Sequence, residues 1–230
     1  MIQTDFSFQT NLSAFTNLDS FVQCVQGDSP THHALYQKIV QAYAGEGRVY
    51  HTLAHIGHVL KQVDVLTASV PPLPQSQRLA LNLAGWFHDV MYDPRRNDNE
   101  EQSAHWMTRE LQFLRIPTPI MTQTQHLILT TRSHEARADD LPAQILLDAD
   151  LSILGAPADV YARYATAIRQ EYAFVPDDAY RAGRRTVLER FLSRPKIFHT
   201  PLAVAQLENQ ARLNLTEEIR ALSTPLHQHP

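Results

Sequence analysis

Apolar residues along most of the chain recur at spacings of three and four, which is the period of a helix that buries one face. Ile56, Val59, Leu60, Val63 and Leu66 follow this period within one segment. The chain has only seven glycines, and it lacks the alternating β-branched runs between tight-turn pairs that are typical of hairpins. The pattern therefore predicts an all-α protein.

Polar residues followed by proline stand where several helices are expected to begin. Ser29-Pro30, Thr118-Pro119 and Thr200-Pro201 each resemble an N-cap with proline in the first helical position. Asp98 and Glu101 have the spacing of a capping box, in which each side chain bonds to the other residue's backbone. Together with the apolar period, these signals predict helices at about residues 11–25, 30–44, 52–68, 76–91, 98–115, 119–133, 142–154, 158–173, 177–192 and 201–222.

The predicted helix of residues 76–91 is apolar nearly all round, which is typical of a helix buried at the centre of a domain. His88 and Asp89 stand near its end. A buried carboxylate is costly unless it meets a partner charge, a hydrogen-bond donor or a metal. The small residues Ala84 and Gly85 lie one turn earlier, where they are expected to leave room for a bound group.

Two other predicted helices place ionisable groups beside apolar faces. His55 borders the apolar face of residues 52–68, and leucine and isoleucine flank Asp150 in the helix of residues 142–154. Asp148 falls on a more polar face. Asp150 is therefore the better candidate ligand, and Asp148 is the better candidate for a residue that contacts the ligands and not the metal. Taken singly, each group also fits a structural role, such as a hydrogen-bonded histidine or an aspartate that caps a helix.

The combination is more specific than its parts. His55, His88, Asp89 and Asp150 supply two imidazoles and two carboxylates from three helices. Mixed nitrogen and oxygen ligation suits Mn, Fe, Co, Ni or Zn better than Ca, and Mg stays open. One divalent cation would offset the cost of burying all four groups. The residues therefore predict a metal site.

Four phrases of the sequence, in this order, resemble a known family: RVYHTLAHI (48–56), WFHDVMYD (86–93), DNEEQSA (98–104) and DADLSILG (148–155). They resemble the HD superfamily of metal-dependent phosphohydrolases, and within it the branch of small bacterial predicted HD phosphohydrolases. The resemblance runs from about Arg48 to the C-terminus. It implies one HD-type helical domain over residues 1–230, with a metal-site core at about 48–155 and accessory helices in 1–47 and 156–230.

The resemblance also implies roles for single residues. The four candidate ligands would hold the metal, and Asp89 would in addition orient the attacking water. Some HD proteins hold a second metal with two further histidines, to which His126 and His134 correspond in order. These two are eight residues apart, about two helical turns, and His134 is the candidate for the second metal. An equally good interpretation is that these are two partly exposed histidines near a helix end. One ion is therefore the default, and two ions are the alternative.

Phosphate requires cationic donors, and arginine binds its oxygens in pairs. The candidate substrate-binding residues near the motifs are Arg48, His51, Arg96 and Arg132. Arg95 follows the central helix closely enough to act over the metal, and Glu100 is a candidate proton shuttle. Most surface arginines are only solvated charge, and Arg181, Arg184, Arg185 and Arg190 are read as a solvated face or as helix-packing contacts.

Composition narrows the protein's class and its partners. A chain of 230 residues that is 43% hydrophobic can bury a core, and a net charge of −4 favours neither a nucleic-acid polymer nor a membrane as partner. The single Cys24 precludes an internal disulfide. Residues 1–26 show no signal peptide, and no apolar run is long enough to span a bilayer. A cytoplasmic protein is therefore expected.

The expected function is hydrolysis of a small phosphate ester, most simply a nucleotide, by a metal-activated water; the substrate class is implied by the resemblance. One alternative is a dinuclear-iron oxygenase of the HD type, which would use both His126 and His134. Another is a non-catalytic domain that binds a metal or a nucleotide. The substrate, the metal and the oligomeric state are not determined by the sequence.

Overall fold

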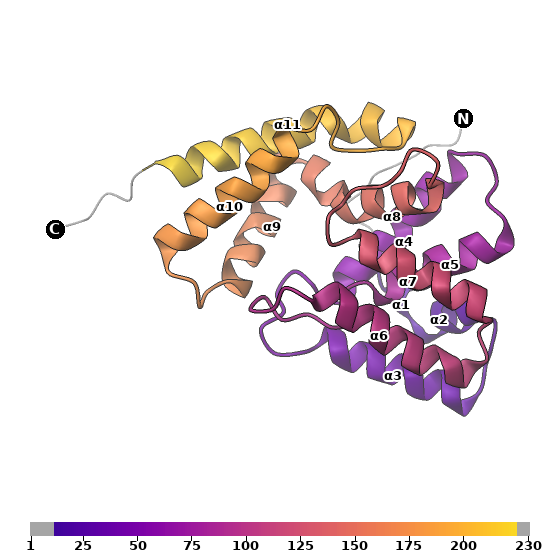
Figure 1. Ribbon diagram of the computed structural model, residues 1–230. Helices are drawn as coiled ribbons and strands as arrows, with labels where there is room; N and C mark the ends of the chain where they lie inside the picture. Colours follow the sequence, from indigo (N-terminus) through magenta and orange to yellow (C-terminus); the bar gives the residue numbers. More distant parts are fainter. Residues whose placement is uncertain (1–11, 225–230) are drawn as a thin grey trace. The chain divides into compact units, whose positions relative to one another are not determined.

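The computed structural model describes residues 12–224, and helices make up most of them (Figure 1). The helices are α1 Ser13–Thr16, α2 Leu18–Val25, α3 Pro30–Tyr43, α4 Leu53–Ala68, α5 Gln75–Phe87, α6 Asn99–Leu111, η1 Gln112–Leu114, α7 Thr118–Thr130, α8 Leu141–Leu151, η2 Ser152–Gly155, α9 Ala158–Glu171, α10 Asp177–Leu192 and α11 Pro201–Ser223, where η marks a 3-10 helix. No strand occurs among the described residues, so the all-α prediction is confirmed.

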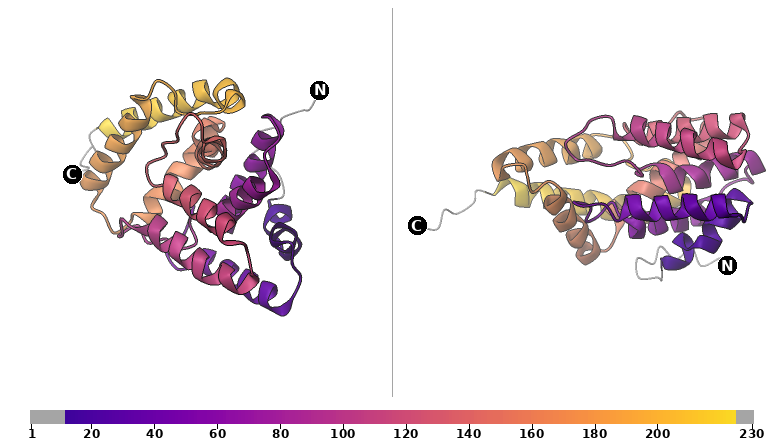
Figure 2. Two further views of the ribbon diagram at one scale, coloured as in Figure 1. Left: turned by 45° about the vertical axis from the view of Figure 1, so that its right-hand side comes forward. Right: turned by 90° about the horizontal axis from the view of Figure 1, so that it is seen from below.

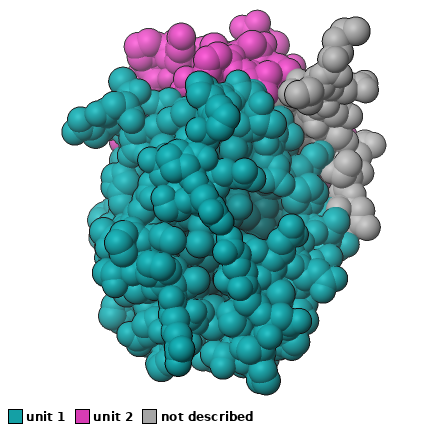
Figure 3. All heavy atoms as spheres, turned by 90° about the vertical axis from the view of Figure 1, so that its right-hand side faces the viewer, with its two compact units in different colours: residues 1–150 teal, residues 151–230 magenta. Residues whose placement is uncertain are grey.

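The chain divides into two compact units, Met1–Asp150 and Leu151–Pro230, which Figure 3 shows in teal and magenta. Each is described by itself, and the expectation of a single domain stays a prediction. Within residues 12–224, every helix is too short or too polar to cross a membrane.

The first predicted helix is in fact two helices. Asn17 has an extended backbone, and its side-chain oxygen accepts a hydrogen bond of 2.8 Å from the Ser20 amide, so α2 starts anew after α1. The predicted cap at Thr200 is confirmed, because its hydroxyl accepts from the Ala203 amide. At α7 the prediction is wrong by one residue, since Thr118 is already inside the helix.

The central helix of unit 1 is α5, whose residues from Ala80 onward are mostly buried, as predicted. It packs along α4 and α7, and the three ribbons lie together in Figures 1 and 2. Trp86 is buried against Phe21, edge to face at 5.3 Å between ring centroids. The α5 helix ends at Phe87 rather than at residue 91, so His88 is its C-cap and Asp89 lies in the turn that follows.

Gly85 has a different role from the one expected of it. A Cβ at Gly85 would lie 2.8 Å from Cδ2 of Leu60, so the space beside this glycine is filled by a side chain of α4. The small residue therefore brings α4 and α5 close together and does not leave an opening for a bound group. This close approach places the end of α5 beside the first turns of α4.

Unit 2 consists of η2, α9, α10 and α11. The α11 helix packs closely on η2, because a Cβ at Gly155 would lie only 2.6 Å from Cβ of Leu207. The buried Asn214 amide donates hydrogen bonds of 2.8 Å to the carbonyls of Leu154 and Ala156, which would otherwise be left unpaired at the end of η2. The close packing at Gly155 and the hydrogen bonds of Asn214 both fix the position of α11 against η2.

The basic cluster predicted on α10 divides between the two roles proposed for it. Arg184 is a packing residue, because it forms an ion pair of 2.8 Å with Glu218 of α11 in a nearly buried position. Arg185 is exposed and pairs loosely with Glu189 one turn later, so it belongs to the solvated face.

Candidate metal centre

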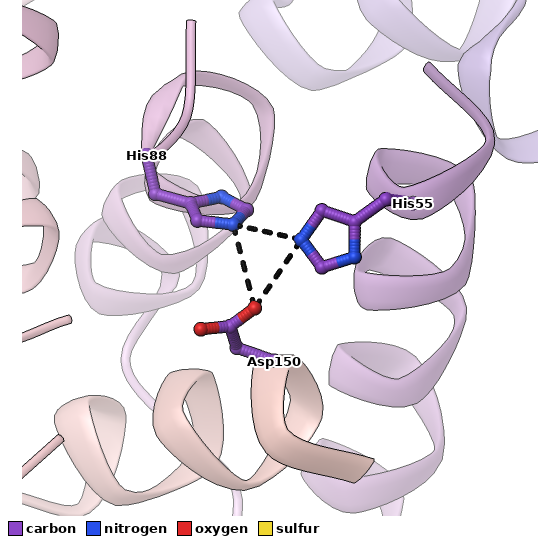
Figure 4. Close-up of side chains that lie close together, drawn as sticks. All are labelled: His55, His88 and Asp150. Carbon is purple, nitrogen blue, oxygen red and sulfur yellow. Dashed lines mark hydrogen bonds and ion pairs between the residues drawn. The ribbon is translucent and has the colours of Figure 1, made fainter. Parts of the chain in front are cut away.

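Three helices of unit 1 bring a histidine–histidine–aspartate triad together (Figure 4). Nε2 of His55 on α4 lies 3.2 Å from Nε2 of His88 at the end of α5. Oδ1 of Asp150 on α8 lies 3.2 Å from the first nitrogen and 3.6 Å from the second. Both imidazoles are buried, with His88 only 1% exposed. Three of the four predicted ligands therefore point their donor atoms at one place.

The fourth predicted ligand, Asp89, contacts both histidines of the triad. Its Oδ2 lies 3.5 Å from Nε2 of His55 and 3.3 Å from Nε2 of His88. The set whose ligand atoms all lie within 4.8 Å of one another is His55, His88 and Asp150, so Asp89 is the outlying member. An outlying carboxylate is the one best able to contact a water as well as an ion.

The His88 ring is oriented by the helix that carries it. Its Nδ1 lies 3.1 Å from the carbonyl oxygen of Gly85, and a carbonyl can only accept, so Nδ1 carries the hydrogen. In the neutral ring, Nε2 is then a bare lone pair directed at the triad, which is the tautomer that a metal ligand requires. Nδ1 of His55 is buried and has no hydrogen-bond partner among the described residues.

The carboxylates and histidines of the cluster shift one another's pKa values. Burial by itself lowers the pKa of His88, but the charge of Asp89 and the contact with Asp150 more than offset this and raise the pKa well above its ordinary value. Burial raises the pKa of both carboxyls, but the neighbouring histidines hold them well below their usual range. The two carboxylates therefore stabilise positive charge at the histidines.

The residues fit a divalent transition metal. Donor atoms in tetrahedral positions about 2.1 Å from an ion lie about 3.4 Å from one another. Within the triad of His55, His88 and Asp150 the three separations are 3.2, 3.2 and 3.6 Å. Two imidazoles and two carboxylates are also a donor set that Mn, Fe, Co, Ni and Zn accept.

The two extra histidines have separate surroundings. Nε2 of His134 lies 3.1 Å from Oδ2 of Asp150, the oxygen that is not the triad's, so His134 approaches the site as predicted. Its backbone φ of 51° is in the left-handed region, which a non-glycine residue adopts at a cost. His126 instead forms an exposed 2.7 Å pair with Asp140. The two histidines therefore have different carboxylate partners, and His134 as a second-metal ligand stays a prediction.

Two of the arginines expected near the substrate are engaged with carboxylates. Arg96 binds Asp98 through two nitrogens, at 2.8 and 2.6 Å, and Arg132 binds Glu101. Asp98 is the N-cap residue of α6 but makes no side-chain cap bond, so the predicted capping box does not form. Arg95 has the most exposed side chain of these three arginines.

The two remaining candidates for substrate contact lie close to the metal ligands. The Arg48 guanidinium donates hydrogen bonds to main-chain carbonyls, so these donors are directed at the backbone. The His51 ring stacks on Tyr92 at 4.2 Å, and Tyr50 packs 4.8 Å from the His55 ring. Sequence reasoning did not single out the two tyrosines, although both belong to the phrases that carry the ligands.

Glu100 and Asp148 are the two remaining carboxyl groups that the sequence singled out. Glu100 is half-buried, and burial raises its pKa, to which the charges of Asp89 and Glu101 add. A carboxyl that keeps its proton to higher pH suits proton transfer. Asp148, which the sequence places on the more polar face of its helix, is buried. It is 0% exposed because α8 is covered on that side too, whereas the Asp150 side chain retains 14% exposure at the triad.

No protein-family model matches this chain, and no curated protein is similar to it at a significant level. The resemblance to the HD superfamily therefore rests on the four sequence phrases.

Proposed function

We propose that this protein is a metal-dependent phosphohydrolase of the HD type that acts on a small phosphate ester such as a nucleotide. One observation carries the proposal: the residues that the HD pattern assigns to the metal meet around two histidines. The ligand atoms of His55, His88 and Asp150 lie 3.2–3.6 Å apart, and Asp89 lies 3.3 and 3.5 Å from the two histidines. They come from α4, from α5 with the turn after it, and from α8, in the order of the pattern. The HD-type bundle is part of the same proposal.

A bound divalent metal would lower the pKa of a water molecule and polarise a phosphoryl oxygen. The residues around it have separate tasks. Asp89, as the outlying carboxylate, accepts a hydrogen bond from the attacking water and so orients it. Glu100, with its raised pKa, passes a proton to the departing ester oxygen. Arg95, with its exposed guanidinium, is the candidate to bind the phosphate oxygens.

The test is elemental analysis of the purified protein together with phosphate-release assays over a panel of nucleotides and simple phosphate esters. Mn, Co, Ni, Fe, Zn and Mg are each added in turn. The expected result is one transition-metal ion per chain and metal-stimulated release of phosphate. His88→Ala is expected to lose both, whereas the control His126→Ala, whose ring pairs with Asp140, keeps both.

Other outcomes would reject the proposal in identifiable ways. Phosphate release that survives both chelation and His88→Ala would show that the cluster is not the reaction centre. Two tightly held irons with oxygen consumption and no phosphate release would favour the oxygenase, although the pairing of His126 with Asp140 does not support it. Metal binding without any turnover would favour a binding domain.

A further inference from the structure

The carbonyls around the end of α5 are bonded to residues that precede α4. The last carbonyls of any helix lack partners within the helix. Here the buried Tyr43 hydroxyl donates to the Trp86 carbonyl at 2.9 Å. Arg48 donates to the carbonyls of Asp89 and Val90, both at 2.9 Å, through Nη1 and Nη2. The turn that carries the His–Asp pair is therefore held from outside the helix.

The same guanidinium also reaches the segment before α4. Nη1 of Arg48 donates to the carbonyl of His51 at 2.8 Å, immediately before the N-cap residue Thr52. His55 stands in the first turn of that helix. One planar group thus bonds both to the chain just before His55 and to the chain at Asp89. Both hydrogens of Nη1 are used in these bonds.

Aromatic rings hold the guanidinium itself in place. Its central carbon lies 5.0 Å from the ring centroid of Tyr43 and 5.4 Å from that of Tyr92, within the range of cation–π attraction. Tyr92 in turn stacks on His51. Arg48 is therefore fixed before any ligand arrives, and its donors are directed at the backbone.

We propose that Arg48 is a positioning residue of the metal centre, which fixes the distance between His55 and the His88–Asp89 pair through its three carbonyl bonds. This inference rests on the proposed metal site and replaces the expectation that Arg48 binds substrate. Lysine cannot reproduce the role, because an ammonium group lacks the rigid planar fork that spans the three carbonyls.

The sign of a charge effect makes the proposal testable. The guanidinium is a positive charge close to the place where a cation would bind. If Arg48 acted only through its charge, its removal would tighten metal binding, since like charges repel. If Arg48 acts by positioning, its removal weakens metal binding despite the relief of that repulsion.

The experiment is titration with Co2+ of the full-length wild-type chain, Arg48→Lys, Arg48→Met and the control Arg78→Met, an exposed arginine on α5. Both Arg48 variants are expected to bind Co2+ about 10- to 100-fold more weakly, the range seen when groups that orient metal ligands are removed. Their visible Co2+ absorption bands are expected to shift. Arg78→Met is expected to match the wild type in both respects.

Circular dichroism and denaturant unfolding establish which variants are folded, and Arg48→Lys keeps the charge and most of the stem if Arg48→Met does not fold. Unchanged or tighter Co2+ binding with an unchanged spectrum in a folded Arg48 variant would overturn the inference. If that variant instead loses affinity for inorganic phosphate alone, Arg48 is a substrate residue and the inference is wrong.

The wild-type result separates this inference from the proposed function. Co2+ binding without phosphate release would reject the hydrolase and leave the role of Arg48 standing. A wild-type chain that binds no Co2+ would reject the metal site and, with it, the positioning role.

Discussion

Each compact unit buries a cluster of ionisable side chains, and the two clusters differ in whether their charges are already balanced. In unit 2, Arg184 meets Glu218 through two nitrogen–oxygen bonds of 2.8 and 3.1 Å, and the Tyr161 hydroxyl donates to the same carboxylate. The charged side chains are 10% and 11% exposed. Every contact joins a donor to an acceptor, and the charges sum to zero.

The cluster in unit 1 has no such balance. With neutral histidines, Asp89 and Asp150 leave two negative charges, and two ring nitrogens face each other at 3.2 Å. The pKa of Arg184 is raised well above its ordinary value, which leaves its charge unchanged at neutral pH, whereas the pKa of His88 is raised from a value already close to neutrality. Both clusters therefore bury charged side chains. Only the cluster of unit 1 indicates a ligand, because its charges do not balance one another.

The largest effect is expected where the unbalanced cluster loses a ligand. Asp150→Asn keeps the size of the side chain and removes a negative charge, so metal binding is expected to be lost. Turnover in the phosphate assay is expected to fall about 100- to 1000-fold, the scale of losing a main electrostatic stabiliser. The helical circular dichroism spectrum should not change. Wild-type turnover in this variant would remove Asp150 from the reaction centre.

The balanced cluster is expected to respond in stability alone. Arg184→Met leaves the Glu218 carboxylate nearly buried without its cation, which is expected to cost about 3 kcal/mol of unfolding free energy. Denaturant titration measures this loss, and Arg184→Met combined with Glu218→Leu should recover most of it. Co2+ affinity should stay at the wild-type value, and a parallel loss of metal binding would break the distinction between the clusters.

A smaller effect is expected at His134. Because its ring meets the outer oxygen of Asp150 at 3.1 Å, His134→Ala should loosen that ligand and weaken Co2+ binding about tenfold, at an unchanged ratio of one metal per chain. His134→Gln, which retains a donor, should recover part of the affinity. Elemental analysis showing two metals in the wild type and one in His134→Ala would establish a dinuclear centre instead.

The smallest effect compares two histidines of α4. His55 meets two carboxylates, whereas burial, with the nearby His55 and Lys61, lowers the pKa of His58 to about 3. An unfolded histidine titrates near pH 6.5, so between these values the unfolded chain binds one more proton than the folded chain. Folding stability therefore falls with pH below 6.5, by at most about 1.4 kcal/mol per pH unit from this residue.

Denaturant unfolding of the wild type and His58→Gln at pH 7.5 and pH 5.5 isolates this contribution, because the other groups titrate alike in both proteins. The loss of stability on acidification should be smaller in the variant. An equal loss in both proteins would show that His58 becomes protonated in the folded state.

The helices and the identity of the candidate ligands were predictable because both depend on residues that are close together in the sequence. Apolar spacing in α4 and α5 depends on a period that a short window contains, and the buried faces came out as predicted. His55, His88, Asp89 and Asp150 were recognisable because ionisable groups stand out on apolar faces. The local pattern did not establish that these four side chains meet, so this expectation depended on the tertiary structure.

The partners of the polar side chains were decided only by the tertiary structure. Arg48 bonds to carbonyls 41 and 42 residues away, and Arg132 to Glu101, 31 residues away. His126 and His134 resemble each other in sequence, yet only His134 reaches Asp150. An arginine or a histidine can serve an ion, a substrate or a carbonyl equally well, so its chemistry alone does not choose among them. The choice depends on which groups the packing of distant helices brings within about 3 Å, and a local pattern carries no information about that.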